Sequence, residues 1–406
     1  MYSILDGLRV VECASFIAAP SCALHLQQLG AEVIRIDPIG GGMDFGRWPV
    51  TSEGRSLYWE GLNKGKRSVA IDLSRSEGRQ LATDLITAPG PDAGLFVTNY
   101  PQTGFMGHAA LSSLRPDLIT VRVLGWRDGG PAMDYTVNAS LGVPYMTGSE
   151  RNAADPVNHV LPAWDLLTGA YAAFALLAAE RQRTRTGKGQ EVTVPLSDVA
   201  LSSLGHMGQI AETLTEGDRP RYGNALFGAF GRDFATADGA RVMVVAITGR
   251  QWTGLVAALG LQQPVAELEV SLAVSFAGDE GQRFVHRNVL FPLVERAIGV
   301  LPLAQLRIRF NRSSVLWSTY QTLRTALERD PRLSLNTPLF SMLEHPSGLR
   351  YPAPGAAATF QGEQRLSPVP APKLGEHTDQ VLAELLSLSA TRIGALHDAG
   401  IIAAAP

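Results

Sequence analysis

Residues 8–36, LRVVECASFIAAPSCALHLQQLGAEVIRI, indicate the fold class of the chain. Leu8–Val11 and Glu32–Ile36 are short runs rich in β-branched residues, which predict strands, and Ser21–Leu29 between them predicts a helix. Gly30 follows this helix at the position where a left-handed backbone commonly ends a helix. A strand, a helix and a second strand at this spacing predict parallel strands joined by a crossover helix.

The same alternation continues along the chain and predicts a doubly wound α/β domain. Further strands are expected at Val69–Leu73, Leu95–Thr98, Leu118–Val123 and Gln190–Leu196, and further helices at Glu77–Ile86, Trp164–Arg183 and from Ser197 to about Thr213. The helix Trp164–Arg183 is rich in small residues, and the Gly-containing stretch 186–189 ends it.

A second α/β pattern follows and predicts a smaller domain. Residues 1–213 form the first part of the large domain, 214–233 a Gly- and Pro-rich linker, 234–311 the small domain, 312–372 a return linker and 373–406 the C-terminal part of the large domain. The small domain is expected to contain a strand at Arg241–Ile247 and helices at Trp252–Leu259 and Val285–Ile298, and two helices, Thr378–Leu386 and Ala390–Ala399, close the chain.

Composition excludes several classes of protein. The 406 residues are 45% hydrophobic and 18% charged with a formal net charge of -3, which fits a globular chain and gives no basic surface for nucleic acid. We find no signal peptide and no apolar run of about 18 residues, so a cytoplasmic protein without membrane contact is expected. Cys13 and Cys22 lie outside any CxxC pattern, which predicts buried, reduced thiols rather than a metal site.

Two loops contain residues that are able to contact phosphate groups. Gly40, Gly41 and Gly42 come after the second strand rather than the first, and no Walker lysine follows, so a tight or flexible turn is the better interpretation. Arg47, just beyond these glycines, is a candidate for anion contact. The cluster Lys64, Lys66 and Arg67 precedes a strand, where it fits either a phosphate site or a solvated turn.

Asp165 precedes the Ala-rich part of the long helix and has two interpretations. Asp is a preferred N-cap residue, so the carboxylate fits a purely structural role. The helix dipole and the free N–H groups would also keep such a carboxylate ionised, as a nucleophile requires. His159 and His206 form no HExxH or similar pattern, and no GxSxG stretch occurs, which argues against metal hydrolases and serine hydrolases.

Several motifs in order along nearly the whole chain resemble one family. They are LDGLRVVE (5–12), LGAEVIRID (29–37), NKGKRSVAIDL (63–73), TNY (98–100), DLLTGAYAAFALLAAERQRTRTGKGQ (165–190), RYGN (221–224), EHPSGLR (344–350) and LGEHTDQVL (374–382). This set resembles the class III CoA-transferases, the family of formyl-CoA and carnitine CoA-transferases. The resemblance implies a Rossmann-like large domain built from the N-terminal half and the C-terminal tail, a small α/β domain between them, and an interlocked homodimer.

The resemblance also implies roles for individual residues. Asp165 matches the catalytic aspartate, and the CoA moiety of the acyl-CoA substrate is expected to lie on Phe16, Ile17, Ala18, Ile71, Asn99 and Tyr100. No cofactor beyond that CoA is implied, and no metal. Three positions depart from the family pattern: Pro38 replaces a basic residue, no Arg follows Tyr100, and the loop 246–252 contains a single glycine, Gly249.

The stretches 37–50, 133–148 and 156–165 narrow the resemblance to a member that moves CoA within one dicarboxylic acid. Such a substrate needs an anchor for its idle carboxylate, and Arg47, Tyr135, Asn138 and His159 are the candidates. Three other functions stay open: CoA transfer between two separate acids, racemisation of a 2-methylacyl-CoA with His159 as an acid–base group, and acyl-CoA binding without turnover.

Overall fold

The computed structural model describes residues 1–150 and 154–405, which fall into two compact units. The large unit comprises residues 1–141, 159–211 and those from 335 onward, and the second unit comprises 142–150, 154–158 and 212–334. The boundary after residue 211 lies two residues from the predicted one at 213. The assignment of 142–150 and 154–158 to the second unit was not predicted, because this short excursion has no change in composition that marks it.

A seven-stranded sheet forms the centre of the large unit. Its strands lie in the order β12-β3-β2-β1-β4-β5-β6, and all pairs are parallel except β12 with β3. The strands are β1 (Arg9–Cys13), β2 (Glu32–Asp37), β3 (Arg67–Ile71), β4 (Leu95–Thr98), β5 (Ile119–Leu124), β6 (Gln190–Pro195) and β12 (Ile402–Ala403). The predicted doubly wound sheet is confirmed, and the antiparallel β12 was missed.

The strand order reverses direction between β1 and β4. The chain first adds β2 and β3 on one side of β1 and then returns to add β4, β5 and β6 on the other side. In open α/β sheets the loops at such a switch point diverge and leave a crevice outside the carboxyl ends of the strands. The loops that follow β1 and β4 are therefore the first place to look for a binding site.

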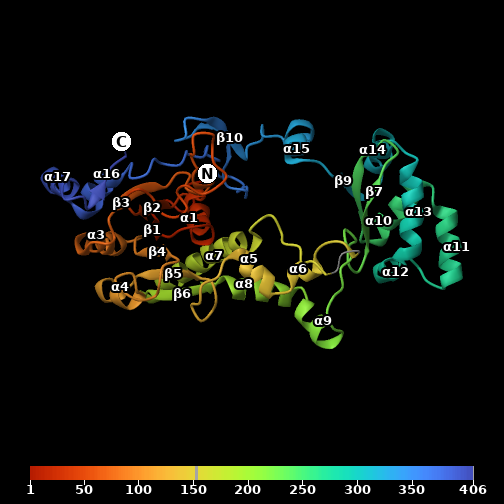
Figure 1. The fold of residues 1–406 in the computed structure, drawn as a ribbon, viewed down its shortest axis with the longest axis horizontal. Coiled ribbons are helices and arrows are strands. Elements are labelled where there is room, and N and C mark those ends of the chain that lie inside the picture. Colours follow the sequence, from red (N-terminus) through yellow and green to blue (C-terminus); the bar gives the residue numbers. More distant parts are fainter. Residues whose placement is uncertain (151–153, 406) are drawn as a thin grey trace. The chain divides into compact units, whose positions relative to one another are not determined.

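Helices cover both faces of this sheet (Figure 1). One hydrophobic core joins the sheet to the helices α1 (Ala18–Gln28), α5 (Asp134–Ser140), α7 (Ala163–Thr186) and α8 (Leu196–His206). A second core joins the other face to α3 (Ser76–Thr87), α4 (His108–Leu114), α16 (Thr378–Leu386) and α17 (Ala390–Asp398). Cys13 and Cys22 are fully buried in these cores, as predicted, and burial raises the pKa of both thiols.

Small residues in α7 let this helix approach α1 closely. Ala172, Ala173 and Ala179 of α7 are buried in the core together with Ala18 and Ala19 of α1. At Gly169 a side-chain carbon would lie 1.9 Å from Oγ of Ser21, so any larger residue would force the two helices apart. This contact places the N-terminus of α7 beside the N-terminus of α1, at the switch point of the sheet.

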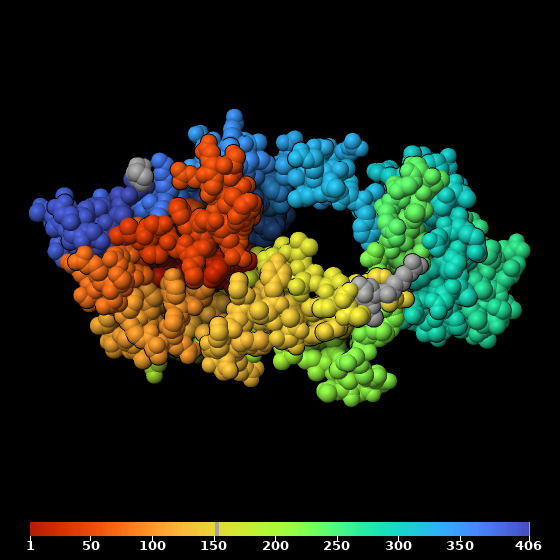
Figure 2. Space-filling model, viewed as in Figure 1, coloured from red at the N-terminus to blue at the C-terminus, as the bar shows by residue number. Residues whose placement is uncertain are grey.

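The C-terminal segment packs on the N-terminal part of the same unit (Figure 2). β12 pairs with β3, and Thr378 at the start of α16 accepts a hydrogen bond from the backbone of Ala70 at 3.0 Å. Within the predicted return linker 312–372, β10 (Phe340–Glu344) and β11 (Arg350–Pro354) form a hairpin that was not predicted. Glu60 of α2 (Leu57–Leu62) accepts hydrogen bonds from Ser347 and Tyr351 of this hairpin.

The second unit contains a three-stranded antiparallel sheet in the order β7-β8-β9. Its strands are β7 (Phe230–Ala235), β8 (Arg241–Ala246) and β9 (Leu316–Thr319). Its helices are α6 (Val143–Met146), α10 (Gly249–Leu259), α11 (Gln262–Leu272), α12 (Glu280–Val285), α13 (Arg287–Gly299), α14 (Leu303–Asn311), α15 (Leu323–Arg329) and a 3-10 turn (Pro331–Leu333). The predicted linker 214–233 therefore ends too late, since β7 begins within it.

One predicted helix is divided in the structure. The helix expected from Ser197 to about Thr213 is α8 followed by α9 (Gln209–Thr215), and Met207 and Gly208 separate them. The helix expected at Val285–Ile298 is α13, which begins two residues later than predicted. Within the described residues, no single helix is both long and apolar enough to cross a membrane. One bent pair, α13 with α14, reaches that length and apolarity only when the two helices are counted together.

Candidate active site

A cavity of about 770 Å³ lies at the carboxyl ends of β1, β4 and β5 in the large unit. Asp165, at the start of α7, lies in its wall. The lining also includes five of the six residues predicted to contact CoA, which are Phe16, Ile17, Ala18, Asn99 and Tyr100. The crevice that the topology predicts is therefore where the residues predicted from the family resemblance come together.

The loop between β1 and α1 has an unusual backbone at this cavity. Phe16 has a φ of 68°, in the left-handed region that bulky residues rarely adopt. Asn99 fixes the loop from the other side of the switch point, because its side chain accepts a hydrogen bond from the backbone N–H of Ser15 at 3.1 Å and donates one to the carbonyl of Ser15 at 2.8 Å. Strained conformations of this kind persist where the surroundings hold them and are concentrated at functional sites.

Arg122 holds the loop that follows β4 at the cavity. This buried residue of β5 donates hydrogen bonds to the carbonyls of Tyr100 at 2.7 Å and Pro101 at 3.0 Å, and it pairs with Glu191. Burial raises the pKa of Tyr100 to about 12. Sequence reasoning missed Arg122, since an arginine inside a strand gives no sign of which loop it will hold.

Ile71 differs from the other predicted CoA contacts. Its side chain is fully buried in the second core, and it does not belong to the lining of the cavity. The residue lies at the end of β3, where it pairs with Ile402. The structure therefore gives Ile71 a packing role, and its predicted contact with CoA stays a prediction.

The basic cluster before β3 faces the interior and existing carboxylates. Lys66 is buried against Glu12 at 2.7 Å and also donates to Asn63 at 2.9 Å, while Arg67 pairs with Glu32 and with Glu384. Lys64 is buried, and burial lowers its pKa to about 8. The interpretation of this cluster as a phosphate site is wrong for Lys66 and Arg67, because both cations are already neutralised by carboxylates.

The three glycines form a structural turn above a buried arginine. Arg35 is 1% exposed and contacts Glu12 at 2.8 Å, Asp37 at 2.9 Å and Asp44 at 3.0 Å, so it ties both ends of the loop 37–44 to the sheet. Gly41 has a φ of 92°, and a side-chain carbon there would lie 2.5 Å from the ring of Phe45. The loop therefore needs glycine for its shape, and it delivers Arg47 to the site.

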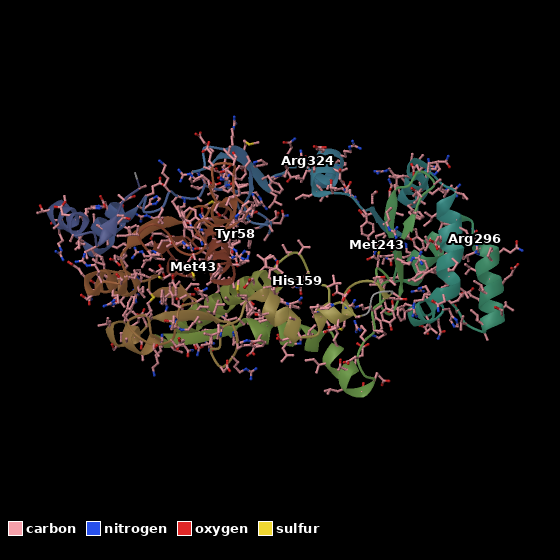
Figure 3. All side chains as sticks on the ribbon, in the orientation of Figure 1. Met43, Tyr58, His159, Met243, Arg296 and Arg324 are labelled. Atoms are coloured by element: carbon pink, nitrogen blue, oxygen red, sulfur yellow. The ribbon has the colours of Figure 1, made fainter. Side chains whose placement is uncertain are left out.

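Arg47 is the cation that acts on Asp165. Its guanidinium lies 5.4 Å from the ring centre of Phe16 and 5.7 Å from that of Tyr58, and its charge lowers the pKa of the Asp165 carboxyl. The hydroxyl of Tyr58 is buried and has no hydrogen-bond partner among the described residues. Figure 3 labels Tyr58, which sequence reasoning missed. Neither Arg47 nor Tyr58 belongs to the lining of the cavity, but Arg47 lies over the ring of Phe16, which does. A guanidinium and an unpartnered hydroxyl are both suited to hold a carboxylate.

Asp165 is not the N-cap of α7, so that interpretation is wrong. The helix begins at Ala163 after Pro162, and Asp165 lies within its first turn. The cap is supplied instead by Asp134, the buried first residue of α5, whose Oδ2 accepts hydrogen bonds from the N–H groups of Trp164 at 2.7 Å and Asp165 at 3.2 Å. The side chain of Asp165 is thereby free to face the cavity.

The expectation that the helix N-terminus keeps Asp165 ionised is also wrong. Burial, and then the charge of Asp134, raise the pKa of Asp165 to about 7, and Arg47 opposes this rise. Burial disfavours the charged form of a carboxylate, and a second carboxylate nearby disfavours it further. A group with such a pKa is a stronger base than an ordinary carboxylate, as is typical of catalytic groups.

The remaining predicted residues surround Asp134 rather than the cavity. His159, which Figure 3 labels, hydrogen-bonds Oδ1 of Asp134 through Nε2, and its ring lies 5.7 Å from that of Tyr135. The hydroxyl of Tyr135 donates to the carbonyl of Val160 at 2.9 Å. Asn138 is fully buried and accepts a hydrogen bond from Nε1 of Trp164 at 3.0 Å. None of the three belongs to the lining of the cavity.

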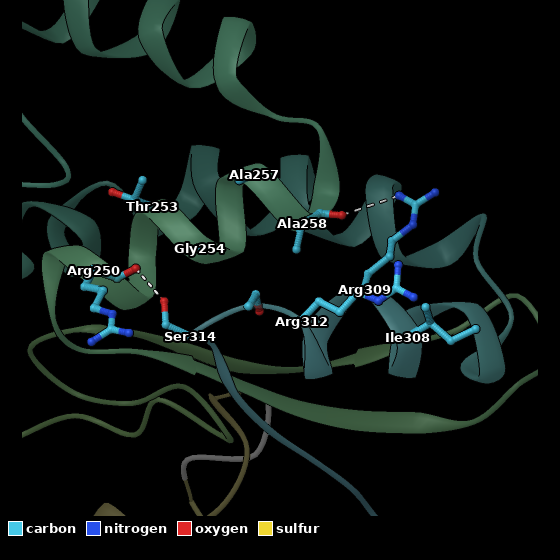
Figure 4. A pocket seen from close by; sticks show the side chains of 10 residues that line it. Arg250, Thr253, Gly254, Ala257, Ala258, Ile308, Arg309, Arg312 and Ser314 are labelled. Atoms are coloured by element: carbon cyan, nitrogen blue, oxygen red, sulfur yellow. Dashed lines mark hydrogen bonds between the residues drawn. The ribbon is translucent and has the colours of Figure 1, made fainter.

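The second unit has a cavity of its own, of about 850 Å³ (Figure 4). Three arginines and small side chains line it: Arg250, Thr253, Gly254, Ala257, Ala258, Ile308, Arg309, Arg312, Ser313 and Ser314. This lining contains no carboxylate, thiol or histidine, and none of the predicted site residues belongs to it. Chemistry rather than size therefore identifies the cavity at Asp165 as the candidate active site.

The sequence matches known proteins over nearly its full length. The model of CoA-transferase family III matches residues 5–378. The chain is 50% identical to 2-methylfumaryl-CoA isomerase of Chloroflexus aurantiacus, over 99% of this chain and 98% of that protein. It is 29% identical to succinyl-CoA–D-citramalate CoA-transferase of the same organism, over 95% and 94% of the two chains.

The fold matches solved structures as well. A CaiB/BaiF family protein from Brucella suis is similar with a TM-score of 0.75 and 25% identity, over 95% of this chain and all of that one. The similarity includes the large mostly parallel sheet and therefore agrees with the α/β fold class predicted from residues 8–36.

Proposed function

The chain belongs to CoA-transferase family III, and from this premise we propose that it moves CoA between the C1 and C4 carboxyl groups of 2-methylfumaryl-CoA, also called mesaconyl-CoA. The observation that carries the proposal is the 50% identity with 2-methylfumaryl-CoA isomerase over almost the whole chain. The site supports it, because a single carboxylate of raised pKa lies in the wall of the cavity, with a cation beside it.

The first half of the reaction detaches CoA from C1. The carboxylate of Asp165 attacks the thioester carbonyl, and the C–S bond breaks to release CoA thiolate and leave an acyl–aspartyl anhydride. The thiolate then attacks the aspartyl carbonyl of this anhydride. An aspartyl-CoA thioester forms, and the C1 carboxylate of 2-methylfumarate is released into the cavity.

The second half repeats these steps at the other end of the diacid. The C4 carboxylate attacks the aspartyl thioester and expels thiolate, which then attacks the C4 carbonyl of the new anhydride. The product is the C4 thioester, and Asp165 is again a free carboxylate. Each leaving group is a thiolate or a carboxylate and needs no proton, so the site requires no acid–base histidine. Water must be excluded, since it would hydrolyse the anhydrides.

Arg47 and Tyr58 are the groups that we propose for the idle carboxylate of the substrate. The Arg47 guanidinium acts on Asp165 electrostatically, and the Tyr58 hydroxyl is buried without a partner among the described residues. A carboxylate between them would receive a charge-assisted hydrogen bond and satisfy the orphaned hydroxyl. Because the diacid presents either end in turn, one anchor serves both thioesters.

One incubation tests the proposed reaction. Purified protein with 2-methylfumaryl-C1-CoA and no added acid should form the C4 isomer, which chromatography with mass spectrometry resolves. Hydroxylamine added during turnover should convert Asp165 to a hydroxamate, which is detected on its peptide. If isomer forms only after a free acid is added, the enzyme transfers CoA between two acids and the intramolecular proposal fails.

No observation favours racemisation of a 2-methylacyl-CoA. That reaction needs a base beside the α-carbon, and His159 is the only histidine that was proposed for it. The Nε2 of His159 is engaged by Asp134, and the residue does not line the cavity. Incorporation of solvent deuterium at the α-carbon of a saturated 2-methylacyl-CoA would nevertheless reveal such an activity.

We further propose that two chains form an interlocked homodimer in the cytoplasm, with no cofactor beyond the CoA of the substrate. Support for the dimer comes from α7, which exposes Leu167, Tyr171 and Phe174 on its outer side. Light scattering should give a mass of about twice 43.4 kDa. Phe174→Glu should weaken the dimer, whereas Leu214→Glu, equally apolar and exposed on α9, serves as the comparison.

A further inference from the structure

The first turn of α7 is held by a side chain from another helix. Four N–H groups at a helix start have no partner within the helix, and an N-cap side chain usually accepts one of them. Here the residue before the helix is Pro162, which has no polar side chain. Asp134 of α5 supplies the acceptor instead, for both Trp164 and the nucleophile Asp165.

α5 is tied to this turn at a second point. The amide oxygen of Asn138, one helical turn after Asp134, accepts a hydrogen bond from Nε1 of Trp164 at 3.0 Å. Asp134 is 1% exposed, so its carboxylate has exchanged water for these protein donors. The two contacts fix the rotation of the first turn of α7, and this rotation decides whether Asp165 faces the cavity or the core.

His159 completes the arrangement. Its Nε2 hydrogen-bonds the oxygen of Asp134 that does not accept from α7, and its ring is flanked by those of Tyr135 and Trp164. The two oxygens of Asp134 therefore have different partners, the imidazole on one side and the helix start on the other. A carboxylate held in this way is fixed in orientation as well as in position.

We propose that Asp134 and His159 are a positioning pair that holds the first turn of α7 so that the carboxylate of Asp165 faces the substrate. The inference rests on the proposed role of Asp165 as the nucleophile. Asp134 does not belong to the lining of the cavity, and both of its oxygens already have partners in the protein. Its effect on the reaction passes through the backbone of Asp165 and through its own negative charge.

The charge has a separate consequence. The ionisable groups that act on Asp165 are Asp134 from α5, Arg47 from the loop before α2, and Tyr58 of α2. Asp134 raises the pKa of Asp165 and Arg47 lowers it. Removing the charge of Asp134 while keeping its hydrogen bonds should therefore let Asp165 ionise at lower pH.

Two variants separate the two effects. Asp134→Asn keeps an oxygen that accepts from α7 but loses the charge, and it should move the acid limb of the kcat/KM profile to lower pH. Asp134→Ala removes both and should lower kcat by about 100-fold with little change in KM, because a small misplacement of a reacting group has effects of that size. The kcat of His159→Gln should lie between those of Asp134→Asn and Asp134→Ala.

Asp279→Asn is the matched control. Asp279 caps α12 in the second unit by accepting from Gly281 at 2.8 Å, and it should leave both kcat and the pH profile unchanged. If Asp134→Ala does not fold, His159→Gln tests the positioning and Asp134→Asn tests the charge. The positioning role is overturned if folded Asp134→Ala, or His159→Gln in its place, keeps kcat within about two-fold. The charge effect is overturned if Asp134→Asn leaves the acid limb unmoved.

Trapping of Asp165 by hydroxylamine tests the positioning role independently of the proposed substrate. The trap needs only the first half-reaction, so it works with any acyl-CoA that acylates Asp165. If the wild-type chain is trapped but forms no isomer, the proposed substrate is wrong, and the trapping rates of the Asp134 variants still test the positioning. Equal trapping rates in the wild type and Asp134→Ala would overturn the positioning role.

Discussion

Two groups of carboxylates in the large unit differ in how their charge is compensated. Glu12, Asp37 and Asp44 surround Arg35, and Glu12 also contacts Lys66, so each carboxylate has a direct ion pair. At the start of α7 the carboxylates of Asp134 and Asp165 lie near each other instead, and Asp165 makes no side-chain ion pair or hydrogen bond among the described residues.

The difference indicates what each group does. A buried charge that is fully paired holds elements together and is unreactive, because its partners already occupy its lone pairs. A carboxylate that lacks such partners stays basic and can attack an electrophile. The first group therefore shapes the loop that carries Arg47, and the second contains the nucleophile.

The strongest way to break the second group is Asp165→Asn. This change removes the nucleophile and leaves its shape, so CoA transfer should fall by about 10⁴-fold or more. Turnover of the dicarboxylyl-CoA measures the loss, and the hydroxamate peptide should be absent. Asp198→Asn, a carboxylate on the exposed side of α8 paired with Arg127, is the control and should keep its activity.

The matching change in the first group is Glu12→Gln, and it should act on stability. It leaves Lys66 without its carboxylate partner and Arg35 with one fewer, and breaking a buried ion pair costs about 3–5 kcal/mol. Denaturant unfolding followed by fluorescence measures the difference. The control is Glu384→Gln, which breaks an exposed pair with Arg67 and should lower the stability far less. Equal losses for both changes would contradict the distinction between the groups.

Arg47→Gln removes the cation whose charge acts on Asp165, and it is expected to weaken binding of the diacid. Loss of a charge-assisted hydrogen bond of about 1.5–3 kcal/mol predicts a kcat/KM about 10–100-fold lower for the dicarboxylyl-CoA. Trapping of Asp165 by a monocarboxylyl-CoA of the same length should change much less. Tyr58→Phe should give a smaller loss of the same kind, and an equal loss for both substrates would exclude the carboxylate anchor.

The pH dependence of activity follows from the pKa of Asp165, which is about 7. Only the ionised carboxylate attacks, so kcat/KM should rise with pH and level off above about pH 7–8. A profile that is already flat at pH 5 would contradict the raised pKa. Stopped-flow or initial-rate assays between pH 5 and 9 measure it.

The smallest effect concerns stability at high pH. Because the pKa of Asp165 is raised on folding, the stability that its protonated form confers is complete below about pH 4 and lost as the pH rises through about 7. Asp165→Asn removes this loss and should be more stable than the wild type at pH 8, by about 1 kcal/mol or roughly 2 °C. The difference between the two proteins should shrink at pH 4, which thermal unfolding at both values checks.

Most of the large sheet could be predicted from sequence, because each of its parallel strands is marked by the residues of the strand itself. Strands such as Leu95–Thr98 are continuous apolar runs, because a parallel strand is buried on both faces. β12 could not be found in this way. It has two residues, and its pairing with β3 joins segments that are more than 300 residues apart.

The site could be predicted only in part, for a related reason. Asp165 has a recognisable motif around it, but Asp134 lies 31 residues earlier and reaches α7 only because α5 packs on that helix. Its position at the start of a seven-residue helix gives no periodicity from which to place it. Tyr58 could not be predicted either, because its distinguishing feature is a hydroxyl that has no hydrogen-bond partner among the described residues of the folded chain.

The pairing of β12 with β3 also determines when the large sheet is completed during synthesis. The second unit ends before residue 335, whereas the large sheet receives its edge strand only with residues 402 and 403. The ribosome therefore completes the second unit while the N–H and C=O groups at the outer edge of β3 are still unpaired. These groups are then able to pair with a strand of another chain. During that interval the nascent chain is most exposed to wrong pairing, and chaperones that shield strand edges should bind it then.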